Sequence, residues 1–338
     1  CIQKNNRLYF EFSIILKKIH YWRRIFSAYV LKRKSQLTFW HEQPQKNINY
    51  SSNSLGSYYM TFYKKANYTA NLDNNGIPML NYQGKIGLQY NPIAIAQWGL
   101  GNYNLWFEQK SKKSYNKFLA SSDWLVKNLK KNEHGIYVWV HNFNFEYRDT
   151  LIAPWYSGLA QGQAISLLVR AFKETENIEY KNTCLKALES FKHDIFEGGV
   201  SFVDNRGNKW IEEYIVNPPT HILNGFIWSL WGLYDYKLLF NDLNINVLFD
   251  NYLETLIRNL HEYDLGYWSK YELSNKPIPM IASLFYHKLH IVQLQIMYEL
   301  TNKEIFNHYS LKWQKQIQNK LFRSIALVHK SIFKVLYY

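Results

Sequence analysis

Two kinds of helical segment constrain the fold of this chain more than any other feature of its sequence. Residues 221–239 are apolar on nearly every side of a helix, so this segment requires burial on most of its surface. Residues 303–322 are amphipathic, with Phe306, Tyr309, Trp313, Ile317 and Leu321 on one face and Lys312, Lys315 and Gln316 opposite. We therefore expect the first segment inside the protein and the second at its surface.

Eight segments have a helical pattern, and they fall into four pairs. They are residues 92–103, 113–130, 158–173, 178–194, 221–239, 245–261, 287–301 and 303–322. Alternating inner and outer helices are what an (α/α) toroid requires, with its cleft at the end where the connecting loops gather. The sequence therefore predicts a mainly α fold, an (α/α) toroid or incomplete barrel of about four helix pairs. Residues 137–158 and 198–214 are predicted to form short β hairpins at one rim.

The same patterns divide the chain into four predicted regions. They are a basic amphipathic N-terminal arm (1–36), an irregular or β-hairpin lead-in (37–90), the (α/α) barrel (91–325) and a tail (326–338). Asn75-Gly76 carries turn chemistry within the lead-in. Asn91 is predicted to cap the first barrel helix, with Pro92 at its first position.

The formal charge of +14 is concentrated at the N-terminus. Residues 1–36 contain nine Lys or Arg and one acid, Glu11, which is +8, and leave +6 for the remainder. A basic amphipathic helix lies on an anionic membrane or a polyanion, although a solvated helix packing on its own domain has the same pattern. The net charge of +6 on the rest of the chain suits a polyanionic substrate. We expect no nucleic-acid partner.

No stretch approaches the about 20 apolar residues that a membrane span needs, and the start lacks the pattern of a signal peptide. The expected location is therefore cytoplasmic or membrane-associated. The chain begins with Cys rather than Met, so we expect that sequence upstream of Cys1 is missing. Cys1 and Cys184 are the two cysteines, which excludes a disulfide framework and a cysteine metal cluster.

Aromatic residues make up 18% of the chain, with 28 tyrosines among them. Tyrosine and tryptophan suit a wet cleft that must also offer flat apolar surface, as sugar-binding clefts do. A compositional bias towards tyrosine explains the same number equally well. The composition therefore permits a sugar-binding cleft without requiring one.

Four long motifs carry a family resemblance. They are "GKIGLQYNPIAIAQWGLGNYN" (84–104), "PWYSGLAQGQAISLLVRAF" (154–172), "EEYIVNPPTHILNGFIWSLWGLYDY" (212–236) and "YHKLHIVQLQ" (286–295). In this order they resemble the C-terminal catalytic domain of the D-glucuronyl C5-epimerases, over about residues 55–301. These enzymes invert C5 of glucuronate to give iduronate within a polysaccharide. The resemblance implies an (α/α) barrel, an acidic polysaccharide substrate and a homodimer. In the family, β-rich domains precede the barrel and help to form the dimer, and these domains are not seen in this sequence.

The implied chemistry is proton transfer at carbon. C5 of a uronate lies next to a carboxylate, so removal of its proton gives an ene-diolate that cations or hydrogen-bond donors must stabilise. Reprotonation from the opposite face inverts the centre, so two acid/base groups must flank the sugar ring. Neither a metal nor an organic cofactor is required. A tyrosine, with a pKa near ~10, gives a stronger base than an ordinary carboxylate when neighbouring cations lower that pKa.

The resemblance also implies site residues. Glu213 and Tyr214 match the catalytic Glu-Tyr pair of the family, Tyr286 matches the tyrosine that opens its Tyr-His-x-x-His-Ile motif, and Tyr267 matches another cleft tyrosine. Our working assignment makes Glu213 and Tyr286 the acid/base pair, with Tyr214 and Tyr267 holding the substrate. Spacing does not reveal which of the four takes the proton. Where the family has an arginine that binds the carboxylate this chain has Lys270, which keeps the charge but loses the bidentate fork.

Further substrate-binding candidates each have a structural alternative. They are Arg148, Arg206, Gln161, Gln163, Asn224, His287 and His290. Asn224 either anchors its helix or lines the pocket floor. His287 and His290 share a helix face, as metal ligands do, but without a third ligand nearby we favour buried, hydrogen-bonded histidines and no metal. Gly158 and Gly162 are expected to permit close packing of an inner helix.

Three other functions remain open from the sequence. A polysaccharide lyase would abstract the same proton and then expel the C4 oxygen. A glycosidase needs two carboxylates across the scissile bond, and Glu212 and Glu213 are a poor pair because neighbours on a strand point to opposite faces, one towards a cleft and the other towards solvent. The non-enzymatic alternative is an inactive module that binds acidic glycans.

Overall fold

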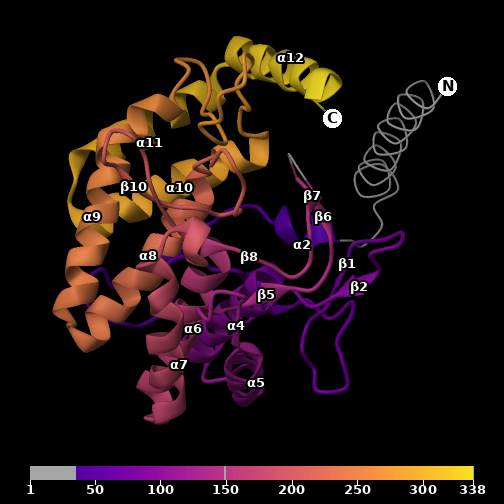
Figure 1. Cartoon of the computed structure of the whole chain (residues 1–338), viewed down its shortest axis with the longest axis vertical. Coiled ribbons are helices and arrows are strands. Elements are labelled where there is room, and N and C mark those ends of the chain that lie inside the picture. The colour runs from indigo at the N-terminus through magenta and orange to yellow at the C-terminus, as the bar shows by residue number, and fades with distance from the viewer. Residues whose placement is uncertain (1–35, 148–149, 338) are drawn as a thin grey trace.

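The computed structural model of the chain describes residues 36–147 and 150–337 (Figure 1). The predicted basic arm lies outside these residues apart from Gln36, and so does Arg148. The α-helices are α2 (Gln36–Trp40), α3 (Tyr63–Ala66), α4 (Pro92–Gln109), α5 (Lys112–Asn128), α6 (Gly158–Thr175), α7 (Ile178–Leu188), α8 (Leu223–Phe240), α9 (Leu243–Asn259), α10 (Leu284–Thr301), α11 (Glu304–Gln318) and α12 (Lys320–Tyr337). The predicted mainly α fold is confirmed.

Four helix pairs build the barrel, as predicted. The helices α4, α6, α8 and α10 are buried on most sides, whereas their partners α5, α7, α9 and α11 bury one face only. Neighbouring inner helices pack in the order α4, α6, α8 and α10 (Figure 1). The contrast in hydrophobic pattern therefore separates the inner from the outer layer.

The four inner helices share one construction. Each has 18 residues and ends at a residue in the left-handed conformation, namely Lys110, Glu176, Asn241 and Asn302. One further residue then precedes the outer helix, so the turn within each pair is tight. Because all four pairs close at the C-terminal ends of the inner helices, the long connections lie at their N-terminal ends. Asn91 caps α4 as predicted, accepting hydrogen bonds from the amides of Ile93 and Ala94 at 2.9 and 3.1 Å.

Glycines allow α6 and α8 to approach backbone to backbone. A Cβ added at Gly162 would lie 2.4 Å from the Cα of Ser229, and one at Gly232 would lie 2.3 Å from the carbonyl oxygen of Gly162. Real Cβ atoms do not come so close, so both positions require glycine. The predicted role of Gly162 in inner-helix packing is confirmed, whereas Gly158 instead lies against the backbone of Glu212.

The lead-in completes the barrel core between α4 and α8. Leu55, Tyr58, Tyr59, Met60 and Phe62 belong to the main hydrophobic cluster, and the amide of Tyr58 donates to the side chain of Asn104 in α4 at 2.7 Å. The predicted hairpin forms within it, because β1 (Leu80–Asn81) pairs antiparallel with β2 (Leu88–Gln89). The lead-in is therefore part of the folded core as well as a connection.

A buried ion pair joins the lead-in to two inner helices. The guanidinium of Arg170 in α6 donates to both carboxylate oxygens of Asp235 in α8, at 2.6 and 3.1 Å, and both side chains are almost wholly inaccessible to solvent. Asp235 also accepts from the hydroxyl of Tyr59, and the Nε of Arg170 donates to the carbonyl of Gly56 at 2.9 Å. These bonds satisfy the two charges, which burial alone would penalise.

Short antiparallel strands precede the inner helices. They are β3 (Lys130–Lys131) with β4 (Tyr137–Val138), β5 (Val140–His141) with β8 (Trp155–Tyr156), β6 (Phe145–Glu146) with β7 (Thr150–Leu151), and β9 (Ser201–Val203) with β10 (Lys209–Ile211). The strands β8 and β10 lead into α6 and α8, so they lie at the end of the barrel where the inner helices begin. Residues 137–158 and 198–214 form hairpins there, as predicted.

The C-terminal part differs from the predicted helix and tail. The segment 303–322 is divided between α11 and α12, because the Asn319 side chain accepts from the amides of Leu321 and Phe322 and so starts a new helix. Residues 326–337, predicted as a tail, continue α12. The predicted segment 178–194 likewise ends earlier, at Leu188, and continues in short 3-10 turns at Glu189–Phe191 and Ile195–Glu197.

We predict that Gly162→Ala lowers the free energy of unfolding by roughly 2 to 3 kcal/mol, because the added methyl group must separate α6 from α8. Gly56→Ala is the matched control, since a Cβ there would meet Phe107 at an ordinary 3.8 Å. Urea unfolding followed by circular dichroism measures both values. Equal destabilisation by the two substitutions would contradict the close approach described here.

Candidate active site

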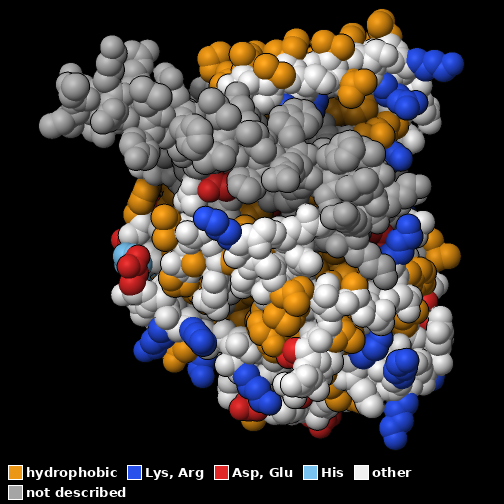
Figure 2. Space-filling model, turned by 90° about the vertical axis from the view of Figure 1, so that its right-hand side faces the viewer, with side chains coloured by type: hydrophobic (Ala, Val, Ile, Leu, Met, Phe, Trp, Pro, Cys, Tyr) orange, Lys and Arg blue, Asp and Glu red, His pale blue; other side chains and the backbone are white. Residues whose placement is uncertain are grey.

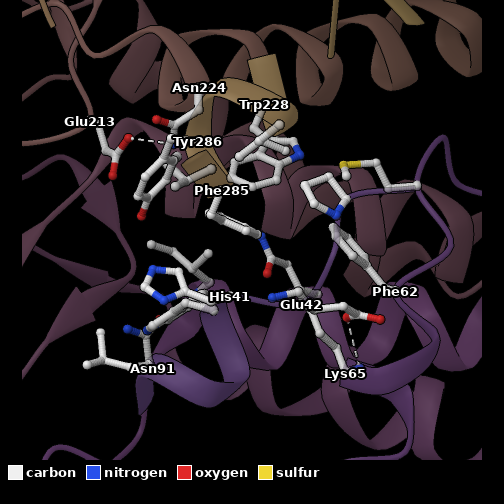
Figure 3. A pocket seen from close by; sticks show the side chains of 18 of the residues that line it. His41, Glu42, Phe62, Lys65, Asn91, Glu213, Asn224, Trp228, Phe285 and Tyr286 are labelled. Atoms are coloured by element: carbon white, nitrogen blue, oxygen red, sulfur yellow. Dashed lines mark hydrogen bonds between the residues drawn. The ribbon is translucent and has the colours of Figure 1, made fainter. Parts of the chain in front are cut away.

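A pocket lies at the N-terminal ends of the inner helices, with a volume of about 160 Å³ (Figure 3). The inner helices contribute Ile93, Gln97, Leu159, Asn224, Trp228, Phe285, Tyr286 and Leu289 to its lining. The rim strands and their connections contribute Phe145, Trp155, Glu213 and Tyr214, and the lead-in contributes His41, Glu42, Lys65 and Tyr82 among others. Three parts of the chain that are distant in sequence therefore meet around one space.

The position of the pocket gives it a favourable field for an anion. The first turns of α4, α6, α8 and α10 all supply lining residues. The helix dipole makes each N-terminus electropositive, and this favours negative charge within the first turn. The pocket is therefore suited to an acidic ligand before any charged side chain is considered.

Glu213 places a buried carboxyl in the pocket. It follows β10 and lies against α8, where Gly225 leaves room for it, since a Cβ there would be 2.2 Å from the Glu213 Oε2. The Asn224 side-chain amide donates to that oxygen at 3.2 Å. Burial raises the pKa of Glu213 to about 8, and although hydrogen bonds from Tyr214 and Asn224 oppose this shift, the nearby acids Glu272 and Glu212 add to it. Glu213 therefore changes protonation near neutral pH.

Glu212 has a structural role, and the expectation that one of the two neighbouring glutamates faces solvent is wrong. Its side chain is wholly buried and accepts from the amides of Thr220 and His221, at 3.3 and 3.0 Å. The ring Nδ1 of His221 also bonds to its carboxylate. These bonds hold the turn before α8, so that Glu213 alone of the pair lines the pocket.

Tyrosines surround the Glu213 carboxyl. The rings of Tyr271 and Tyr286 lie 4.8 Å apart, and those of Tyr147 and Tyr214 lie 4.5 Å apart. Burial raises the pKa of Tyr214 well above its usual value, and the nearby Glu213 raises it further. The Tyr214 hydroxyl is therefore neutral at physiological pH and can act as a hydrogen-bond donor.

The lead-in brings a lysine to the pocket that the sequence did not indicate. Lys65 is 5% exposed, its Nζ donates to the carbonyl of Phe39 at 2.9 Å, and three aromatic rings lie within 4.5 to 5.6 Å of it. Burial lowers the pKa of Lys65 to about 7, while the negative charge of Glu42 acts in the opposite direction. Among the described residues that line the pocket, Lys65 is the one lysine or arginine.

His41 lies beside the aromatic wall of the same space. Its ring is 4.9 Å from that of Phe285 and 6.2 Å from that of Tyr286. Burial lowers the pKa of His41 to about 4, and Lys65 adds to the effect, so the imidazole is neutral. Figure 3 shows Glu213, Asn224 and Tyr286 towards one end of the pocket and Glu42 and Lys65 towards the other.

Three of the residues that were predicted to contact substrate do not line the pocket. The hydroxyl of Tyr267 is bonded to His329 of α12, at 2.6 Å from its Nδ1. The backbone of Lys270 forms a bridge with Ile281. Arg206 is exposed and donates to Glu262 at 2.6 Å.

The predicted glutamines and histidines are buried structural groups outside the pocket lining. Gln161 bonds to backbone groups of Trp139 and Ser157, and Gln163 donates to the hydroxyl of Tyr58. His287 and His290 share the hydroxyl of Ser269, at 2.8 and 3.0 Å. Within residues 36–147 and 150–337, no group of three His, Cys, Asp or Glu side chains is arranged to hold a metal ion.

The structure thus brings Glu213, Tyr214, Tyr286 and Asn224 together, and adds Lys65 and His41, which sequence reasoning missed. The run "TFYKKANY" (61–68) places two lysines directly after two aromatic residues, which is the one signal that could have indicated a binding segment. A lysine in a short polar segment is usually solvated, however, and the burial of Lys65 depends on Phe39 and Trp40, which come earlier in the chain. The pattern alone could not distinguish the two cases.

Comparison with known proteins gives one family and two relatives. The family described as D-glucuronyl C5-epimerase C-terminus matches residues 131–315. A D-glucuronyl C5-epimerase of Caenorhabditis elegans is 32% identical over 221 residues, which are 61% of this chain and 35% of that protein. An uncharacterised protein of Methanocaldococcus jannaschii is 28% identical over 181 residues, 53% of this chain and 57% of that protein. The chain therefore spans well under two thirds of the length of either relative.

Among solved structures, cellobiose 2-epimerase from Spirochaeta thermophila is similar, with a TM-score of 0.50. The similarity covers 75% of this chain and 65% of that one, at 13% sequence identity. At this identity the likeness shows the fold, and it agrees with the (α/α) toroid described above.

The raised pKa of Glu213 predicts a measurable pH dependence of stability. Its pKa is about 8 when folded and near 4.5 otherwise, so between these values the unfolded chain releases a proton that the folded protein retains. The contribution of Glu213 to stability therefore falls as pH rises from about 4.5 to about 8, by an amount on the order of a few kcal/mol. We predict that Glu213→Gln removes this dependence and becomes more stable relative to the parent protein as pH rises.

Urea unfolding at a series of pH values between these limits measures the effect. Glu197→Gln, at an exposed carboxylate, is the control and should keep the pH dependence of the parent protein. A Glu213→Gln variant that follows the parent curve at every pH would contradict the assignment.

Proposed function

Because the chain belongs to the family of D-glucuronyl C5-epimerase C-terminal domains, we propose that it is a carbohydrate epimerase that converts D-glucuronate residues to L-iduronate within an acidic polysaccharide. The observation that carries the proposal is the buried Glu213 carboxyl, with a pKa of about 8, in a pocket shared with Tyr286. A general acid or base is most effective when its pKa lies near the working pH, and Glu213 meets this condition.

The reaction proceeds by two proton transfers at one carbon. One group removes the proton from C5, and the electron pair of the C–H bond moves into the carboxylate to form an ene-diolate. A second group then gives a proton to C5 from the opposite face, and the ene-diolate returns its electrons to the new C–H bond. Glu213 and Tyr286 are the proposed pair, since they reach the pocket from different elements, the connection after β10 and the first turn of α10. Protons balance without a cofactor.

Tyr214 is the proposed donor that orients the substrate. Its neutral hydroxyl can hydrogen-bond to an oxygen of the sugar or to the Glu213 carboxyl, and donation to the ionised carboxyl would favour the base form of Glu213. Asn224 holds the Glu213 Oε2 in place from α8. These two residues are therefore proposed to position the acid/base group and not to exchange the proton.

Lys65 is the proposed partner of the substrate carboxylate. The ene-diolate carries two negative charges, and a cation in a site with little water stabilises them far more than one in solvent. Lys270, the residue that the family pattern indicates, does not line the pocket, whereas Lys65 does. The electropositive ends of the four inner helices would act in the same direction.

We predict that Glu213→Gln and Tyr286→Phe each lower turnover by at least about a hundredfold, because each removes one proton-transfer group. Proton NMR of heparosan, with and without N-sulfation, in D2O measures turnover as deuterium at C5 together with iduronate signals. Tyr298→Phe is the control on the same helix, where the hydroxyl bonds to Glu304 on the outside of the barrel and its loss should leave the rate unchanged.

Two further measurements on the same samples distinguish an epimerase from a lyase and from a binding module. Product that absorbs ultraviolet light, from a C4=C5 double bond conjugated to the carboxylate, would indicate a lyase in place of an epimerase. Polysaccharide binding without deuterium exchange, equal in the parent protein and both variants, would indicate a binding module and overturn the proposal.

For Lys65 we predict that Lys65→Met raises the KM for the polysaccharide by about tenfold or more, because the carboxylate loses its charged partner. In the parent protein the free lysine loses its proton above a pH of about 7, so affinity should fall by about tenfold per pH unit above that point. Lys64→Met is the control, since Lys64 is an exposed neighbour. Equal effects of the two substitutions, or an unchanged pH profile in Lys65→Met, would contradict the role.

A further inference from the structure

The last helix, α12, exposes a continuous apolar stripe. Leu321, Ile325, Val328, Ile332 and Val335 follow one another at intervals of four, three, four and three residues, so they share one face of the helix. Leu321, Val328 and Val335 are 64%, 58% and 66% exposed. Figure 2 shows hydrophobic side chains in a row along the upper edge of the molecule, where α12 lies. Contiguous exposed apolar surface of this kind marks an interaction site.

The stripe is held outwards by contacts on the other side of the helix. Phe333 and Ala326 are buried, and His329 bonds to the carbonyl of Pro279 at 2.9 Å. The Lys330 ammonium also bonds to the carbonyl of Ile281. Ile325, Val328 and Ile332 of the stripe line a groove with a volume of about 510 Å³, together with Ile278. Since α12 already buries one face, the stripe is additional apolar surface and not the face that attaches the helix.

The charged residues of α12 itself are all basic. Glu304 is the last acid in the sequence, and the residues after it include Lys312, Lys315, Lys320, Arg323, Lys330 and Lys334. Lys320 and Arg323 are exposed on α12 itself. Two copies of this helix laid together would bring basic groups towards one another, which disfavours a second copy as the occupant. A negatively charged apolar surface satisfies both features.

From these observations we propose that α12 is a membrane-docking helix that lies in the plane of an anionic lipid surface. The apolar stripe would enter the boundary between headgroups and acyl chains, and the exposed Lys320 and Arg323 would face the lipid phosphates and carboxylates. Within the described residues no helix is long and apolar enough to cross a membrane, so α12 would lie on the surface. This inference does not depend on the proposed reaction.

Vesicle flotation of the full chain tests the proposal. We expect recovery with vesicles of phosphatidylcholine and phosphatidylserine, and little with phosphatidylcholine alone. Leu321→Ser with Val328→Ser should weaken binding by about tenfold or more, because two apolar side chains leave the lipid boundary. Lys320→Glu with Arg323→Glu should have an effect of similar size through lost attraction to the headgroups.

Matched controls use similar residues elsewhere on the surface. Leu243→Ser with Val247→Ser changes two aliphatic side chains of α9 that are 77% and 61% exposed, and Lys112→Glu with Lys113→Glu changes two exposed lysines of α5. Neither control should alter flotation. The proposal is overturned if the α12 variants float as the parent protein does. It is also overturned if the parent protein does not float with vesicles that contain phosphatidylserine. In that case, conversion of a dimer to a monomer by Leu321→Ser with Val328→Ser in light scattering would show that the stripe binds a second copy.

Discussion

The buried pair between Arg170 and Asp235 is the interaction on which the rest of this structure depends. It joins α6 to α8, which glycines at 162 and 232 bring close together, and it reaches the lead-in through Gly56 and Tyr59. Two charges removed from water are costly unless every donor and acceptor has a partner. Because the partners come from three parts of the chain, the charges are stable only when those parts are assembled correctly.

That assembly also determines the pocket. The tight turns at the C-terminal ends of the inner helices leave the opposite end for the long connections, and these carry Glu213 and the lead-in to the helix N-termini. Burial acts there on two groups in opposite ways, since it favours the neutral acid of Glu213 and the neutral amine of Lys65. Both groups therefore titrate within about one pH unit of neutrality, where a small change in their surroundings alters their charge.

Much of this arrangement could be predicted from the sequence. The helix pairs, the hairpins and the Asn91 cap depend on local sequence patterns, and those patterns were sufficient to predict them. The motif resemblance brought Glu213 and Tyr286 to one pocket. The missed residue Lys65 and the misassigned residue Tyr267 depend on contacts between distant segments: the burial of Lys65 depends on Phe39 and Trp40, and the position of Tyr267 depends on His329. No pattern within a window of residues contains such information.

The contacts of the lead-in have a consequence for how the chain folds. Tyr59 and Asp235 are 176 residues apart in sequence, and Gly56 and Arg170 are 114 apart, whereas the two helices of each pair are neighbours. Contacts between distant residues require a large loss of chain entropy before they give any stabilisation, so they tend to form late. The helix pairs are therefore able to form first, and the barrel closes when the lead-in enters between them. A chain synthesised from its N-terminus would hold Tyr59 of the lead-in without its partner Asp235 until α8 has left the ribosome.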